Sequence, residues 1–191
     1  MAELRTRRAM AAGLAGAALA ALAAFGGLSP VSPDLAATVT SGTPVDQGRF
    51  SVTVLGAEAG RDSASADTPV LVVTMRVTNT GRETAPLTAF ERGVGARVGG
   101  RWLRPVPFGS RLELSEGETS TQLQPGVPVR LTKAFHRPEA LWPSEATVEL
   151  RGWEYDRGSF GDVDGGGPWS VPDSGPPVAR VRTPVTMAGT T

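Results

Sequence analysis

The stretch VLVVTMRVTNTG at residues 70–81 is the strongest indication of the fold class of this chain. Its apolar residues recur at every second position and many of its residues are β-branched, a pattern that favours a strand over a helix. Two turn-forming residues follow: Asn79 can accept backbone N–H groups, and Gly81 can adopt a positive φ. The stretch therefore predicts a β-strand that ends in a tight turn.

The same two-residue period recurs through most of the chain. We expect further strands at residues 50–55, 94–98, 129–135, 147–153 and 178–185. Clusters of Gly, Pro, Asp and Ser separate them. Gly99-Gly100 suits a two-residue hairpin turn, and Pro125-Gly126 fits the central positions of a type II turn. Because no segment after residue 28 has a sustained 3.6-residue period, the pattern predicts an all-β chain folded as a sandwich.

The composition excludes several classes of protein. Among 191 residues there are no cysteines, so a disulfide scaffold, a thiol catalyst, a Cys-ligated zinc site and a lipid-modified cysteine are all excluded. Lys plus Arg equal Asp plus Glu at 19 each, and a net charge of zero argues against a main role in binding nucleic acid. The 24 glycines and 16 prolines favour many turns.

The N-terminus has the pattern of an export segment. Arg5, Arg7 and Arg8 precede an uncharged run from Ala9 to Pro33, of which residues 9–28 are Ala, Gly, Leu, Met and Phe. As a helix, those 20 residues would span about 30 Å, the thickness of a hydrocarbon core. We therefore expect residues 1–28 to be a signal anchor with the body of the chain outside the membrane, or a signal peptide that is cleaved.

The rest of the chain divides by composition. Residues 29–48 are rich in Pro, Ser, Thr and Gly without a hydrophobic period, and are expected to form a flexible linker. Residues 49–186 carry the strand pattern and are expected to form one β-sandwich. Residues 187–191 are expected to be a frayed tail.

Two motifs together resemble a known family. Residues 70–81 look like the strand followed by Asn-x-Gly of secreted bacterial immunoglobulin-like domains. Leu123-Gln124-Pro125-Gly126, followed by a strand that leads to Phe135 and Pro138, is similar to a stretch of the DUF4352 family, the telokin-like extracellular domains. The resemblance implies an exported immunoglobulin-like β-sandwich, often on a membrane anchor or a lipoprotein, and implies no catalytic residues.

Candidate catalytic and metal sites are few. There is no Gly-x-Ser-x-Gly elbow and no Ser-x-x-Lys dyad at Lys133, the only lysine, and His136 is the only imidazole. Asp162 and Asp164 could contribute to a calcium site, but the ligands that complete an EF-hand loop are missing. We therefore expect no enzymatic activity and no cofactor, and the calcium site remains an open alternative to a polar loop.

Tryptophans and arginines are the candidate binding residues. One or two of the four tryptophans are expected in the core, whereas Trp142 and Trp169 lie in Pro-rich segments and are expected to be exposed. Arg97, Arg101 and Arg104 cluster near the predicted Gly99-Gly100 hairpin and could form a basic strip that meets an anionic polymer, phospholipid headgroups or a protein.

These observations predict an envelope protein without enzymatic activity. Its domain would bind a protein or another envelope component outside the membrane, as an accessory subunit of a membrane complex or alone. The alternative is a secreted module that binds glycan or cell wall through exposed tryptophans. Capture of a membrane protein would support the first prediction, and retention by isolated polysaccharide would support the alternative.

Overall fold

The chain divides into two units, residues 1–35 and 36–191. The computed structural model describes residues of the second unit only: 36–62, 67–114, 117–139, 142–155, 169–171 and 176–188. The predictions for residues 1–28 and for Asp162 and Asp164 therefore fall outside the described residues. No helix among the described residues is long and apolar enough to cross a membrane.

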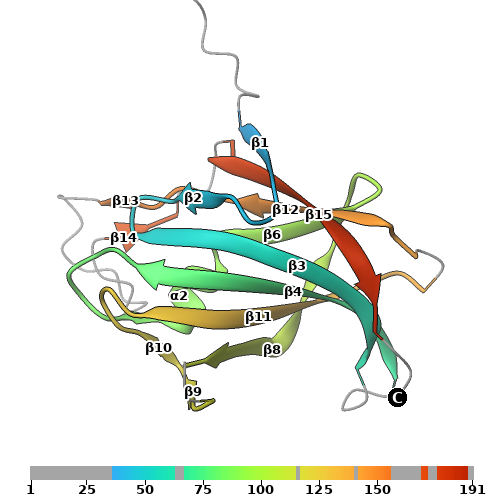
Figure 1. The fold of residues 1–191 in the computed structure, drawn as a ribbon, viewed down its shortest axis with the longest axis horizontal. Coiled ribbons are helices and arrows are strands. Elements are labelled where there is room, and N and C mark those ends of the chain that lie inside the picture. The colour runs from blue at the N-terminus through green and yellow to red at the C-terminus, as the bar shows by residue number, and fades with distance from the viewer. Residues whose placement is uncertain are drawn as a thin grey trace, which may run out of the picture. The chain divides into compact units, whose positions relative to one another are not determined.

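The described residues form strands almost throughout (Figure 1). The strands are β1 (Ala37–Thr40), β2 (Pro44–Asp46), β3 (Phe50–Asp62), β4 (Thr68–Asn79), β5 (Ala85–Pro86), β6 (Val94–Val98), β7 (Arg101–Trp102), β8 (Arg104–Glu113), β9 (Thr119–Ser120), β10 (Gln122–Leu123), β11 (Pro128–His136), β12 (Glu145–Leu150), β13 (Glu154–Tyr155), β14 (Trp169–Ser170) and β15 (Ala179–Met187). One short helix, α2 (Leu87–Glu91), lies between β5 and β6. The prediction of an all-β sandwich is confirmed for this unit.

The main sheet path runs β7-β6-β12-β15-β3-β4-β11-β8-β9. It folds into two layers, which we name the short sheet (β7, β6, β12, β15 and β1) and the long sheet (β3, β4, β11, β8 and β9, with β2 beside β3). Neighbours pair antiparallel except β1 with β15 and β15 with β3, which pair in parallel. The parallel pairs bring the N-terminal strand of the unit against its last strand.

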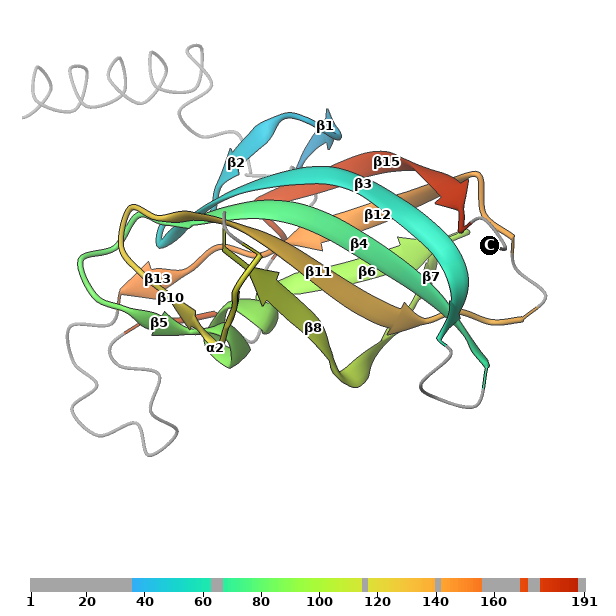
Figure 2. The same ribbon diagram turned by 60° about the horizontal axis from the view of Figure 1, so that its bottom comes forward.

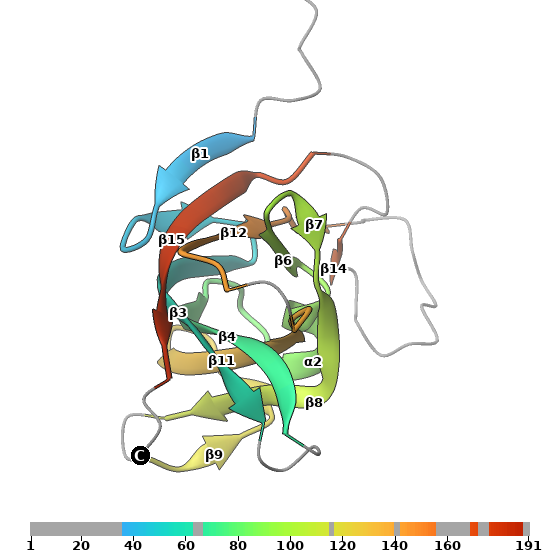
Figure 3. The same cartoon turned by 90° about the vertical axis from the view of Figure 1, so that its right-hand side faces the viewer.

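Two continuous segments join the layers at opposite sides (Figure 3). β15 pairs with β12 over residues 179–184, and its last three residues then pair with β3. On the other side, β7 pairs with β6 and β8 pairs with β11, and only Leu103 separates β7 from β8. Since each segment belongs to both layers, the sandwich is nearly closed around its core.

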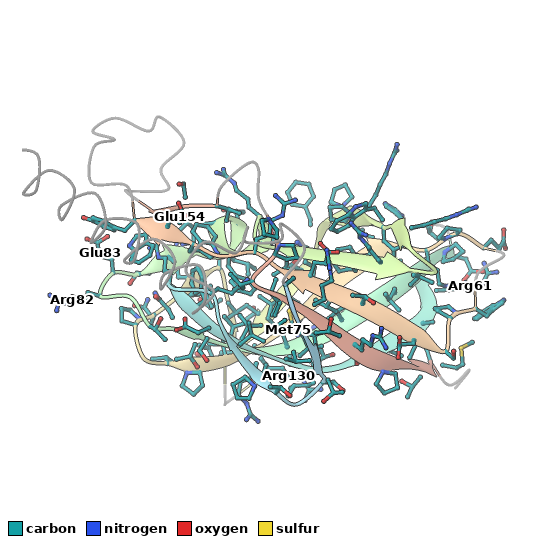
Figure 4. The ribbon with its side chains drawn as sticks, turned by 90° about the horizontal axis from the view of Figure 1, so that it is seen from above. Arg61, Met75, Arg82, Glu83, Arg130 and Glu154 are labelled. Carbon is teal, nitrogen blue, oxygen red and sulfur yellow. The ribbon has the colours of Figure 1, made fainter. Side chains whose placement is uncertain are left out.

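The core is built from the inward sets of the alternating strands. In β4 the residues Leu71, Val73, Met75 and Val77 are buried, as the period predicts. Figure 4 shows Met75 among the strands and Arg130, on the outward set of β11, at the outer side. At one end of the core the ring of Phe50 packs edge-on against Phe90 and Trp153, with centroids 5.1 and 5.4 Å away.

The predicted turn residues join three segments at one end of the sandwich. Asn79 is completely buried; its Oδ1 accepts from the Gly81 N–H at 2.9 Å, and its Nδ2 donates to the carbonyls of Glu83 at 2.7 Å and Leu123 at 2.9 Å. Its own carbonyl accepts from the Gly126 N–H at 2.8 Å. Asn79 is therefore the tie between the end of β4 and the loop before β11.

The two predicted glycines behave differently. Gly126 has φ +73° after Pro125, and Val127 N donates to Gln124 O at 3.3 Å, so the predicted type II turn is confirmed. Gly81 does not have a positive φ, so that part of the prediction is wrong. A Cβ at Gly81 would instead lie 3.1 Å from Asn79 Oδ1, so a small residue is favoured because the amide approaches closely.

The prediction of a flexible linker is wrong for the part that the structure describes. Within residues 29–48, β1 pairs with β15 and β2 pairs with β3. Val45 is buried and Val39 packs against the core, so two apolar side chains hold these strands. These strands show no clear hydrophobic period, because both lie at sheet edges and most of their other residues are exposed and polar.

Lys133 lies on the inward set of β11, between Leu131 and Phe135, and is 5% exposed. Its Nζ crosses the core and donates to the carbonyl of Glu91, at the end of α2, at 2.7 Å and to that of Val94, at the start of β6, at 3.1 Å. Burial lowers the pKa of Lys133 to about 8, against a smaller opposing effect of the Glu91 carboxylate. This lysine ties the helix and β6 to the opposite sheet.

Candidate functional site

The outward face of the short sheet brings charged and aromatic side chains together. In β6 the residues Val94, Ala96 and Val98 point inward, so Gly95 and Arg97 belong to the outward set. The registers place Thr147 of β12 opposite Arg97 and Arg182, and Glu149 opposite Gly95 and Arg180. The outer face thus consists of Trp102, Gly95, Arg97, Thr147, Glu149, Arg180 and Arg182, with Glu145 at its rim.

Glu149 is the centre of this outer face. Its side chain is only 4% exposed, and its Oε1 lies 3.1 Å from Arg97 Nε and 3.4 Å from Arg180 Nε. The contact with Arg97 is an ion pair without the alignment of a hydrogen bond. Two guanidinium groups from neighbouring strands therefore cover one carboxylate, and their attraction is stronger than between fully solvated charges.

Trp102 extends the cluster toward the sheet edge. The guanidinium carbon of Arg97 lies 4.1 Å from the centroid of the Trp102 ring, within cation–π range, and the Trp102 residue is 49% exposed. The ring lies directly on Gly95, since a Cβ at that position would be 2.5 Å from Trp102 Cζ3. The absence of a side chain at Gly95 thus allows Trp102 to lie on the sheet beside Arg97.

The structure separates the three predicted arginines. Arg97 belongs to the outer face of the short sheet, whereas Arg101 pairs with Val98 and so lies on the other side of the pleat. Arg104 begins β8 and faces His136 in the long sheet. The three arginines therefore do not form one strip, because the chain changes sheet between β7 and β8.

The two predicted tryptophans also differ. Trp142 is 55% exposed, as expected, and the guanidinium carbon of Arg137 lies 4.2 Å from its ring centroid. The prediction of an exposed Trp169 is wrong: the residue is half-buried, packs against the core and makes an edge-on contact with Tyr155 at 5.2 Å. Trp153 is the buried core tryptophan, 6% exposed.

Sequence reasoning missed Trp102, Glu149 and Arg180 as members of one site. Their spacing along the chain gives no signal, because they lie on β7, β12 and β15 and meet only through strand pairing. One signal was available locally: Gly95, Arg97 and Trp102 fall on the same face of a hairpin around the predicted turn at Gly99-Gly100, where both glycines have positive φ.

The hollows of the described surface include the following two. One lies over the bulge of β3 and is lined by Leu55, Gly56, Ala57, Glu58, Thr74, Arg130, Pro184 and Thr186. The other lies beside β8 and β9 and is lined by Leu87, Ser110, Arg111, Leu112, Thr119, Ser120 and Thr121. Neither lining combines a nucleophile with a neighbouring imidazole or a pair of carboxylates, the arrangements that hydrolytic chemistry requires. Among the described residues, no three His, Asp or Glu side chains gather as metal ligands would.

No family model and no curated protein matches this chain, so the resemblance to the DUF4352 family is not confirmed. Solved structures that resemble it include a predicted lipoprotein of Staphylococcus aureus (TM-score 0.47, 7% identity, covering 78% of this chain and 97% of that one). Another is an uncharacterised β-sandwich protein of Clostridium difficile (TM-score 0.48, 8% identity, 81% and 97%). A third is a predicted lipoprotein of Bacillus subtilis (TM-score 0.40, 15% identity, 76% and 39%).

Proposed function

We propose that this chain is an extracytoplasmic immunoglobulin-like domain without enzymatic activity that binds a protein partner through the outer face of the short sheet. The supporting observation is the Trp102–Arg97–Glu149–Arg180 cluster. Tryptophan and arginine are enriched among the residues that dominate binding energy at protein interfaces. The ion pairs hold Arg97 in place before binding, which lowers the entropy that association costs.

The charge of the outer face also fits a protein better than a uniform polyanion. Three arginines stand beside two carboxylates, Glu149 and Glu145, and Glu149 is already covered by two of the arginines. Arg182 and the exposed part of Trp102 remain for a partner. Mixed charge around an aromatic residue favours a specific protein surface over nonspecific attraction.

Glycan binding is the competing proposal, and the exposed Trp142 favours it. Stacking on a sugar needs a free ring face. Each ring already has a guanidinium group near it. The guanidinium carbon of Arg97 lies 4.1 Å from the Trp102 ring centroid, and that of Arg137 lies 4.2 Å from the Trp142 ring centroid. We therefore place protein binding first and test the glycan proposal in the same experiment.

Photo-crosslinking from the centre of the outer face tests partner binding. We expect a benzophenone side chain replacing Thr147 in the full chain, in membranes of the native host, to give one discrete crosslinked protein. Trp102→Ala should lower the yield by roughly tenfold or more, as expected for loss of a binding hot spot. Gly95→Ala should act in the same direction, because a Cβ there displaces the Trp102 ring.

The matched control places the same crosslinker at Val127, which is 41% exposed in the turn before β11. It should not give the Thr147 product. Equal products from both positions, or none from Thr147, would contradict the protein partner. Retention of the full chain on isolated wall polysaccharide, lost with Trp142→Ala and not with Trp102→Ala, would establish the glycan proposal instead.

Protease accessibility tests the location outside the membrane. The basic N-terminus and the uncharged run from Ala9 to Pro33 support export, with the cations on the cytoplasmic side. We expect membrane fractionation to recover the full chain, and protease added to intact spheroplasts to digest its C-terminal unit. Recovery of a protected full-length chain in the cytoplasmic fraction would contradict export.

A further inference from the structure

β8 bends within its length (Figure 2), where its register with β11 is interrupted by a bulge. β8 and β11 are in register at Ser110 with Lys133 and again at Pro105 with Phe135. Four residues of β8, Val106 to Gly109, therefore face the single residue Ala134 of β11. Phe108 in this bulge is fully exposed to solvent.

The backbone of the bulge is held in an unfavourable conformation. Phe108 has φ +56°, in the left-handed region that bulky residues rarely adopt. Pro105 and Pro107 restrict the backbone on one side. On the other side Gly109 closes the bulge, since a Cβ there would lie 2.7 Å from Val106 Cβ and 3.1 Å from Ala134 Cβ.

Packing of the Phe108 ring does not offset this backbone strain. A fully exposed ring contributes nothing to the core, so folding alone does not explain why a bulky residue occupies a left-handed position. Asn or Gly would adopt the same backbone without strain. The rigid presentation of an aromatic ring therefore points to an interaction outside the domain.

The surroundings of the bulge identify the kind of partner. Residues 105–108 are Pro, Val, Pro and Phe, an apolar tip without a side-chain hydrogen-bonding group, in which all residues except the half-buried Val106 are exposed. Arg104 and Arg111 flank the tip within β8, and no carboxylate lies between them in the sequence. Glu113, paired with Arg111 at 3.1 Å, is the nearest acid that follows.

We propose that the tip at residues 105–108 inserts Phe108 into the interface of an anionic lipid bilayer. A bilayer accepts an exposed apolar tip without a complementary pocket, and its negative headgroups attract Arg104 and Arg111. A pocket in a protein would also accept a ring, but it would not use the cations on both sides of an apolar tip. This inference concerns the long sheet and does not rest on the partner proposed for the short sheet.

Because the chain has no cysteine, a cysteine introduced at position 108 is the only thiol that a fluorophore can label. Phe108→Cys in the full chain is labelled with an environment-sensitive apolar dye and reconstituted into vesicles of phosphatidylcholine and phosphatidylglycerol. We expect a blue-shifted emission that nitroxide-bearing lipids quench. The same label at Val127 should stay in water, which controls for simple proximity of the domain to the vesicle.

Charge variants test the electrostatic part. Arg104→Gln and Arg111→Gln should each lower the ratio of inserted to free label by about fivefold, the equivalent of about 1 kcal/mol per arginine near an anionic surface. Arg82→Gln, in the exposed turn after β4, makes the same charge change away from the tip and should have no such effect. Vesicles of phosphatidylcholine alone should give a much weaker response.

Phe108→Asn tests whether the Phe108 ring contributes to stability. Asn tolerates the left-handed backbone, so the urea midpoint of this variant should equal or exceed that of the natural chain. A lower midpoint would assign the ring a structural role and overturn the inference. A label at position 108 that responds equally on neutral vesicles would also overturn it. A label that stays in water on anionic vesicles would overturn it too, and would favour a pocket in a protein as the partner.

Discussion

Asn79→Ala should lower the free energy of unfolding by about 3 kcal/mol, because it leaves buried carbonyl groups without a donor. The Nδ2 group of Asn79 donates to Glu83 O and Leu123 O, and its Oδ1 accepts from Gly81 N. Alanine makes none of these bonds and cannot admit water at a position that is completely buried. Urea unfolding followed by far-ultraviolet circular dichroism measures the loss.

The neighbouring residue provides the control for this prediction. Thr80 Oγ1 makes one exposed hydrogen bond, to Gly48 O at 3.3 Å. Thr80→Ala should therefore change stability by less than about 1 kcal/mol. Similar losses for the two variants would show that the Asn79 amide is not the tie between β4 and the loop before β11.

Lys133→Met should abolish a rise in stability between about pH 8 and pH 10.5. Burial lowers the pKa of Lys133 to about 8 in the folded chain, whereas an unfolded lysine titrates near 10.4. Within this window the unfolded chain binds more protons than the folded chain, so the free energy of unfolding increases with pH. Below pH 8 both states are protonated and this contribution is constant.

The size of the effect follows from the shift. A difference of about two pKa units corresponds to roughly 3 kcal/mol between the two ends of the window. The measurement is urea unfolding of both proteins from pH 7 to pH 11, taken as the difference between natural chain and variant so that other titrating groups cancel. Parallel curves of unfolding free energy against pH for the two proteins would contradict a lowered pKa of Lys133 in the folded chain.

Both residues show how polar groups specify this sandwich. Lys133 reaches from β11 to the carbonyls of Glu91 in α2 and Val94 in β6, and Asn79 reaches from β4 to the loop before β11. Each satisfies backbone groups that no strand pairing reaches. Glu83, a partner of Asn79, lies with Glu154 at one end of the unit, while Arg61 marks the opposite end (Figure 4).

Local sequence preferences predict most of the long strands and two of the tight turns. Alternation in residues 70–81 requires a half-buried strand, and Pro125-Gly126 and Gly99-Gly100 form the predicted turns because their backbone preferences are local. A two-residue period states which side chains share a face, but not which strand lies beside it. For the same reason Lys133 could be placed on the inward set, but its partners could not be named.

The edge strands and the site depend on tertiary contacts. β1 and β2 are strands because β15 and β3 offer unpaired backbone groups, although most of their own side chains are exposed. Arg97, Glu149 and Arg180 meet because β12 pairs with both β6 and β15. The strained bulge at Phe108 likewise depends on register with β11. Such pairings join residues far apart in the chain, and no local preference encodes them.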